Sequence, residues 1–108
     1  MIAAALLLSV LAANPDAEPR RAELCLAHIN AMIAEASRET GRVAGPSWFI
    51  RSWWTARLPK EGTPEALTEE QRRALDASMP GRKADDPAAY RAELQSCVNE
   101  AIEGGALP

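Results

Sequence analysis

The residue types most able to do chemistry in this 108-residue chain are two cysteines, each followed three positions later by another possible metal ligand. Cys25 precedes His28, and Cys97 precedes Glu100, so each pair would share one face of a helix. Thiolate, imidazole and carboxylate groups all bind zinc. A zinc site built from these four side chains is one interpretation, although oxidation of the thiols competes with it in an exported protein.

A disulfide is the interpretation that we favour. The chain contains no other cysteine, and the two cysteines of an exported protein usually pair with each other. We therefore predict a bond between Cys25 and Cys97, no bound metal and no cofactor, with His28 at the flank of a buried helical stripe. Closing a loop of this length would stabilise the domain by about 4 kcal/mol in the chain-entropy model.

The first 13 residues predict export. MIAAALLLSVLAA has no charged side chain and is apolar apart from Ser9, which is typical of the central region of a secretory signal peptide and too short for a spanning helix. The small residues Ala12 and Ala13 precede a turn-forming Asn-Pro-Asp, so cleavage is expected after one of them. An uncleaved apolar helix is the alternative. The expected location of the mature protein is the periplasm or the exterior.

Residues 14–108 are expected to form a single helical domain with no membrane span. Pro and Gly cluster at 41–46, 59–64 and 80–87 and in the tail. These clusters divide the domain into four predicted helices, at about 20–42, 48–58, 69–78 and 87–103. The fold class predicted is therefore all-α, a small bundle of about four helices.

The first and last predicted helices each carry an apolar stripe that includes one cysteine. These stripes are Cys25, Ile29, Met32 and Ala36 in the first helix, and Tyr90, Leu94, Cys97 and Ala101 in the last. One cysteine lies near the start of its helix and the other near the end, so a disulfide fits if the two helices pack antiparallel. The third helix has a capping-box pattern at Thr68 and Gln71, and Pro80-Gly81 is expected to end it.

All three tryptophans and the only phenylalanine lie in the second predicted helix. At 100° per residue, Phe49 and Trp53 share one side of this helix, and we expect them to fill the centre of the bundle. Adjacent tryptophans cannot point to the same centre, so Trp48 and Trp54 are expected at the rim. The candidate contact residues for a partner are Trp48, Arg51, Trp54 and Arg57.

Charge and motifs exclude several classes of function. The chain has 12 basic and 15 acidic residues, which are interspersed along it without the basic face that nucleic-acid binding requires. It has one histidine and no Gly-rich phosphate loop, so nucleophilic or phosphoryl chemistry has no evident apparatus. Most acidic residues lie at helix starts or near basic residues, where caps and ion pairs explain them.

The order of an apolar signal, Cys25-Leu26-Ala27, an aromatic helix and the late Cys97 resembles uncharacterised small exported two-cysteine helical proteins of bacteria. That resemblance implies the fold and no activity. We expect a non-enzymatic interaction module of the binding, inhibitor, immunity or chaperone-like kind, with a protein partner in the cell envelope. One alternative is a small envelope enzyme or lytic accessory that uses a carboxylate in a groove beside the aromatic helix. Association with a membrane surface through the candidate contact residues is the other.

Overall fold

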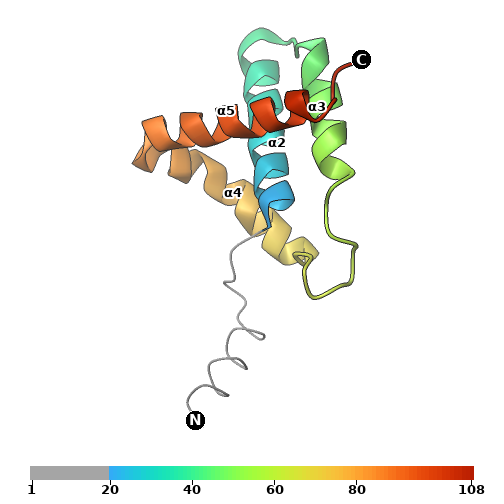
Figure 1. The fold of residues 1–108 in the computed structure, drawn as a ribbon. Helices are drawn as coiled ribbons and strands as arrows, with labels where there is room; N and C mark the ends of the chain where they lie inside the picture. The colour runs from blue at the N-terminus through green and yellow to red at the C-terminus, as the bar shows by residue number, and fades with distance from the viewer. Residues whose placement is uncertain (1–19) are drawn as a thin grey trace.

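The computed structural model describes residues 20–108, which form four α-helices and no strand (Figure 1). The helices are α2 (Arg21–Thr40), α3 (Gly45–Thr55), α4 (Glu69–Asp85) and α5 (Pro87–Glu103). The predicted all-α class and the number of helices are therefore confirmed. The predicted signal peptide, 1–13, lies outside the described residues.

Helix α2 is the centre of the arrangement. It contacts α3, α4 and α5, whereas α3 and α4 each contact α5 but not each other. Figure 1 shows α5 crossing α2, with α3 and α4 on different sides of α2. Across this crossing, Arg21 contacts Glu100 and His28 contacts Glu93, so residue numbers rise along α2 as they fall along α5. The crossing brings the start of α2 to the second half of α5.

The ends of α4 and α5 follow local sequence signals. The Thr68 hydroxyl accepts from the Gln71 N–H at 3.1 Å, and the Gln71 side chain accepts from the Thr68 N–H at 2.9 Å. This capping box confirms the predicted start of α4. At the start of α5, the Asp86 carboxylate accepts from the Ala89 N–H at 3.1 Å, directly before Pro87 in the first turn.

The predicted end of the third helix is wrong. Helix α4 continues through Pro80 and Gly81 to Asp85, although a proline removes one helical hydrogen bond and strains the preceding turn. Contacts on either side of Pro80 hold the helix together, because Met79 is buried against α2 and Lys83 pairs with Glu35 of α2. Packing between helices therefore outweighs the local signal to stop.

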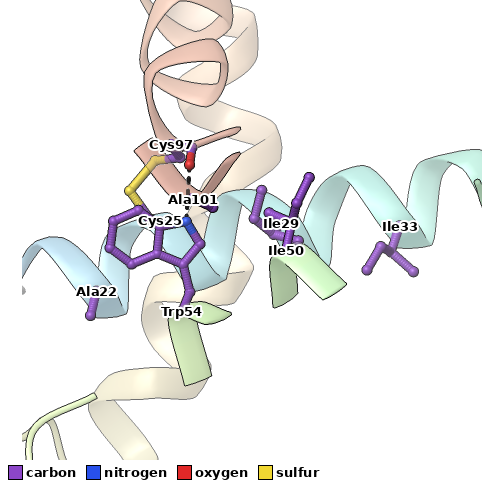
Figure 2. Packing of buried hydrophobic residues seen from close by; sticks show 8 residues of the cluster. All are labelled: Ala22, Cys25, Ile29, Ile33, Ile50, Trp54, Cys97 and Ala101. Atoms are coloured by element: carbon purple, nitrogen blue, oxygen red, sulfur yellow. Dashed lines mark hydrogen bonds between the residues drawn. A yellow bond between two sulfur atoms is a disulfide. The ribbon is translucent and has the colours of Figure 1, made fainter. Parts of the chain in front are cut away.

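Two apolar clusters hold the helices together. The larger one joins α2, α3 and α5 (Figure 2), and its buried members are Ala22, Cys25, Ile29, Ile33, Ile50, Trp54, Cys97 and Ala101. The smaller one joins α2 to α4 through Ala27, Leu75 and Met79. Helix α4 thus adds little to the core, as its thin apolar content predicts.

Candidate functional site

The predicted disulfide is confirmed. Cys25 of α2 and Cys97 of α5 are bonded, with their Cα atoms 5.4 Å apart, and both are fully buried. The zinc interpretation is therefore wrong, because sulfurs bonded to each other are not thiolate ligands. Within residues 20–108, no group of three or more His, Cys, Asp or Glu side chains is placed to hold a metal ion.

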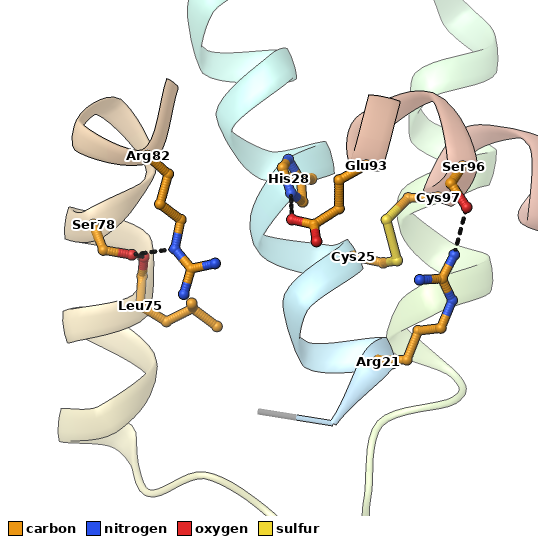
Figure 3. Close-up of polar contacts among 9 residues, drawn as sticks. All are labelled: Arg21, Cys25, His28, Leu75, Ser78, Arg82, Glu93, Ser96 and Cys97. Carbon is orange, nitrogen blue, oxygen red and sulfur yellow. Dashed lines mark hydrogen bonds and ion pairs between the residues drawn. A yellow bond between two sulfur atoms is a disulfide. The ribbon is translucent and has the colours of Figure 1, made fainter. Parts of the chain in front are cut away.

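His28 lies one turn beyond Cys25 and is fully buried. Its Nε2 atom lies 2.5 Å from the Glu93 Oε1 atom (Figure 3), and its ring packs 4.6 Å from the Tyr90 ring, centroid to centroid. The Nδ1 atom has no hydrogen-bond partner among residues 20–108. His28 thus lies deeper than the expected flank position, and its one polar contact joins α2 to α5.

The expected positions of the tryptophans are partly wrong. Trp54, predicted at the rim, is 2% exposed, and its Nε1 atom donates to the Cys97 carbonyl oxygen at 3.0 Å (Figure 2). Phe49, predicted in the core, is 48% exposed. Trp53 is half-buried: its ring meets the Trp54 ring edge-on at 4.8 Å, and its Nε1 atom donates to the Gly104 carbonyl oxygen at 3.3 Å.

The disulfide explains which face of α3 turns inward. Two faces, 100° apart, each carry a large residue one turn before a tryptophan: Phe49 with Trp53, and Ile50 with Trp54. The second face packs over the crossing of α2 and α5, where the Cys97 carbonyl oxygen supplies the acceptor that a buried indole N–H needs. Arg21 closes this position from outside, with its guanidinium carbon 5.9 Å from the centroid of the Trp54 ring.

The outer part of α3 and the turn after it form an aromatic and basic surface, which we call the α3 surface and define as Trp48, Phe49, Arg51, Trp53 and Arg57. Trp48 is 43% exposed, close to the value of Phe49. The Arg51 guanidinium lies 4.8 Å above the Trp48 ring, and that of Arg57 lies 3.5 Å above the Trp53 ring. Of the four predicted contact residues, Trp48, Arg51 and Arg57 therefore lie on this surface, and the buried Trp54 does not.

Charge is less evenly interspersed than expected. The segment 41–60 has Arg42, Arg51, Arg57 and Lys60 as its only charged residues, within a chain whose net charge is −3. The α3 surface is thus locally basic on an acidic protein. This asymmetry was readable from the sequence and was missed, because charges were counted over the whole chain.

A buried carboxylate holds the segment that follows α3. Glu23 of α2 is 4% exposed, and its two oxygens accept from the backbone N–H groups of Arg20, at 3.1 Å, and Leu67, at 2.6 Å. Both oxygens are therefore used by backbone donors, one at the start of α2 and one just before α4. We interpret Glu23 as a structural residue that ties the loop after α3 to the central helix.

A cavity of about 450 Å³ lies between α2 and α4 and is lined by no residue of α3. This cavity is therefore a different place from the expected groove beside the aromatic helix. The carboxylates that line the cavity between α2 and α4 are Glu35 and Asp76. The hydrogen bond from Lys83 lowers the pKa of Glu35, whereas loss of hydration in the groove raises the pKa of Asp76 against the opposing charge of Arg72.

No protein-family model, curated protein or solved structure matches this chain. Within residues 20–108, no helix has the length and apolar character that crossing a bilayer requires. The disulfide is compatible with an oxidising location.

Proposed function

We propose that this protein is an exported interaction module that binds an acidic, partly apolar protein surface through the α3 surface. The observation that carries the proposal is the exposure of Trp48 and Phe49, side by side on a helix whose other face is fixed in the core. Aromatic side chains and arginine are the residue types most enriched at the energetic centres of protein interfaces. The periplasmic or secreted location is part of this proposal.

The energetic gain from covering these two rings is substantial. Aromatic side chains bury roughly 150–250 Å² each, so covering the exposed half would contribute about 2 kcal/mol per ring at 25 cal/mol per Å². The inner face of α3 is anchored by Ile50 and Trp54. The surface is therefore already ordered, and a partner would gain this energy with little cost for ordering the helix.

The charge of the surface selects the chemistry of the partner. Arg51 and Arg57 are each stacked over a tryptophan ring, and segment 41–60 has no carboxylate to neutralise them. Stacking restricts the arginine side chains while leaving guanidinium N–H groups to donate to carboxylates. An acidic protein surface with an apolar centre complements this arrangement.

The test begins with site-specific photocrosslinking in the cell envelope, with a photoreactive phenylalanine analogue in place of Phe49. The crosslinked protein is identified by mass spectrometry, purified, and titrated with the unmodified protein. We expect Trp48→Ala to weaken binding by roughly 30-fold, the effect of losing about 2 kcal/mol at an aromatic hot spot. Arg51→Glu should also weaken binding, and its effect should be larger at low salt than at high salt.

The matched control is Arg91→Glu, which reverses the charge of an exposed residue of α5 that is not part of the α3 surface. It should leave the affinity unchanged within about twofold, the scatter expected for a rim charge outside the interface. Equal effects of Arg51→Glu and Arg91→Glu would contradict the proposal. Flotation with phosphatidylglycerol vesicles tests the membrane alternative: vesicle binding lost in Arg51→Glu, with no protein crosslinked at position 49, would replace the proposed partner by a membrane surface.

A further inference from the structure

The groove between α2 and α4 is a second, separate feature of this molecule. Its wall on α2 is formed by the small residues Ala27, Ala31 and Ala34, and Met79 of α4 and Tyr90 of α5 also line it. Methyl side chains on successive turns of α2 leave the space between the two helices unfilled. The volume of about 450 Å³ lies within the range of pockets that bind small molecules.

One end of this groove has an acidic side chain with Arg72 nearby, and the other end has a basic side chain without an ion pair in residues 20–108. Asp76 and Asn30 mark one end, and both also line a smaller adjoining pocket, which places them together. The other end has Lys83, Glu35 and Arg38. Lys83 donates to both oxygens of Glu35, at 2.9 and 3.1 Å, so Arg38 is the basic residue there that has no such partner among the described residues. From Asp76 to Lys83 the helix rises about 10 Å.

Asp76 is placed to accept a hydrogen bond that the described protein does not supply. Its carboxylate makes no hydrogen bond or ion pair with another residue in 20–108, and its pKa is raised by loss of hydration. Its backbone carbonyl would ordinarily accept from the N–H of residue 80, but that residue is a proline inside α4. Pro80 lines the same groove. Acceptors therefore gather at this end.

Arg38 is the complementary group at the other end. It lies in the last turn of α2 and makes no hydrogen bond or ion pair within the described part of the chain. Its charge contributes to lowering the pKa of Glu35, behind the larger effect of Lys83. An anionic group entering this end of the groove would meet a guanidinium that is free to donate two parallel hydrogen bonds to a carboxylate.

We propose that the α2–α4 groove binds a short apolar peptide with free termini, about three residues long. Its terminal ammonium binds the Asp76 end, its side chains cover the alanine wall, and its carboxylate binds Arg38. An extended tripeptide spans roughly 10 Å, which matches the rise of α4 from Asp76 to Lys83, a residue that lines the groove at the Arg38 end. The occupant is distinct from the partner of the α3 surface, and neither proposal depends on the other.

The probe for this site is trileucine, titrated into the full protein and followed by amide NMR shifts. Shifts are expected in 27–38 and 76–83 and not in α3. Asp76→Asn should weaken binding about fivefold, the upper range for a solvent-accessible ion pair, and N-acetylation of the probe should weaken binding to the unaltered protein equally. The acetylated probe should bind Asp76→Asn and the unaltered protein alike, because both changes remove the same contact.

Arg38→Gln should also weaken the binding of trileucine, and C-amidation of the probe should weaken its binding to the unaltered protein equally. The amidated probe should bind Arg38→Gln and the unaltered protein alike. The matched controls are Glu70→Gln, an exposed acid on α4 outside the groove, and Arg91→Gln, an exposed base on α5; neither should change the affinity. Circular dichroism confirms that each variant is folded. Absence of groove shifts at millimolar trileucine would overturn the proposal, as would an acetylated probe that binds as well as the free one.

Discussion

The Trp54 indole N–H donates to the carbonyl oxygen of Cys97 at 3.0 Å, so this buried tryptophan is bonded to the backbone of a disulfide cysteine. This contact unites α3, α5 and, through Cys25, α2. It also decides which aromatic residues of α3 remain outside. The core and the α3 surface are therefore two consequences of one packing arrangement.

Truncation of Trp54 is the first prediction. Trp54→Ala should lower the free energy of unfolding by roughly 3–5 kcal/mol, because it leaves a cavity against the disulfide. Trp54→Phe keeps most of the volume but loses the hydrogen bond to Cys97, so it should cost less. Trp48→Ala should cost under about 1 kcal/mol, as expected for an exposed position. Urea unfolding measures all three, and a loss at position 48 equal to that at position 54 would contradict the assignment of Trp48 to the surface.

The disulfide gives the second prediction. The double variant Cys25→Ala/Cys97→Ala should lose about 4 kcal/mol, since the bond closes a loop across 72 residues of sequence separation. Alanine is chosen because both positions are fully buried and a serine would bury a hydroxyl. The unaltered protein is isolated from the cell envelope and alkylated without reductant. Mass spectrometry should then find no labelled cysteine in it. A labelled thiol there would contradict both the bond and the export proposal.

Two glycines provide a matched pair for the third prediction. A Cβ atom added at Gly104 would lie 2.2 Å from Cζ2 of Trp53, so Gly104→Ala must displace this indole from the end of α5. We expect a loss of about 1–3 kcal/mol and a shift of the Trp53 indole N–H resonance. Gly81 lies inside α4 with open space around it. Gly81→Ala should therefore stabilise the protein, by about 0.5–1 kcal/mol, and leave the indole resonance unchanged.

The carboxyl groups of the α2–α4 groove give the fourth prediction. In a carbon-13 NMR titration, the pKa of Glu35 should lie below its ordinary value and that of Asp76 above it. Lys83→Met should raise the pKa of Glu35, because it removes the hydrogen bond and the nearby charge. Arg72→Met should raise the pKa of Asp76 further, since Arg72 opposes the effect of lost hydration.

These two shifts have opposite effects on stability. The contribution of Glu35 is present above its unfolded-state pKa and is lost as the pH falls through its lower folded-state pKa. Asp76 contributes most to the stability of the protein when its carboxyl group is protonated. This contribution is lost as the pH rises through its raised folded-state pKa. Relative to the unaltered protein, Asp76→Asn should therefore gain stability as the pH rises from acid to neutral. A gain that grows toward acid pH instead would contradict the raised pKa of Asp76.

Local signals in the sequence determined much of the helical framework. The start of α4 at Glu69 and both ends of α5 were predicted correctly, because caps and first-turn prolines act within three or four residues of where they stand. The disulfide was also predictable, since the only two cysteines lie on apolar stripes. Helical periodicity also separates Trp48 and Arg51 from the buried face of α3, whereas Arg57 is exposed because it lies beyond the end of the helix at Thr55.

Only the tertiary structure decided which face of α3 turns inward and where α4 ends. The two aromatic faces of α3 are nearly equal in size and apolar character, so the choice depends on the acceptor and the space that Cys97 and its crossing helix present from 43 residues away. The continuation of α4 through Pro80 likewise depends on Met79 and Lys83 meeting α2. The alanine-lined groove exists only because those contacts hold the two helices side by side, and no local pattern encodes a space between segments distant in sequence.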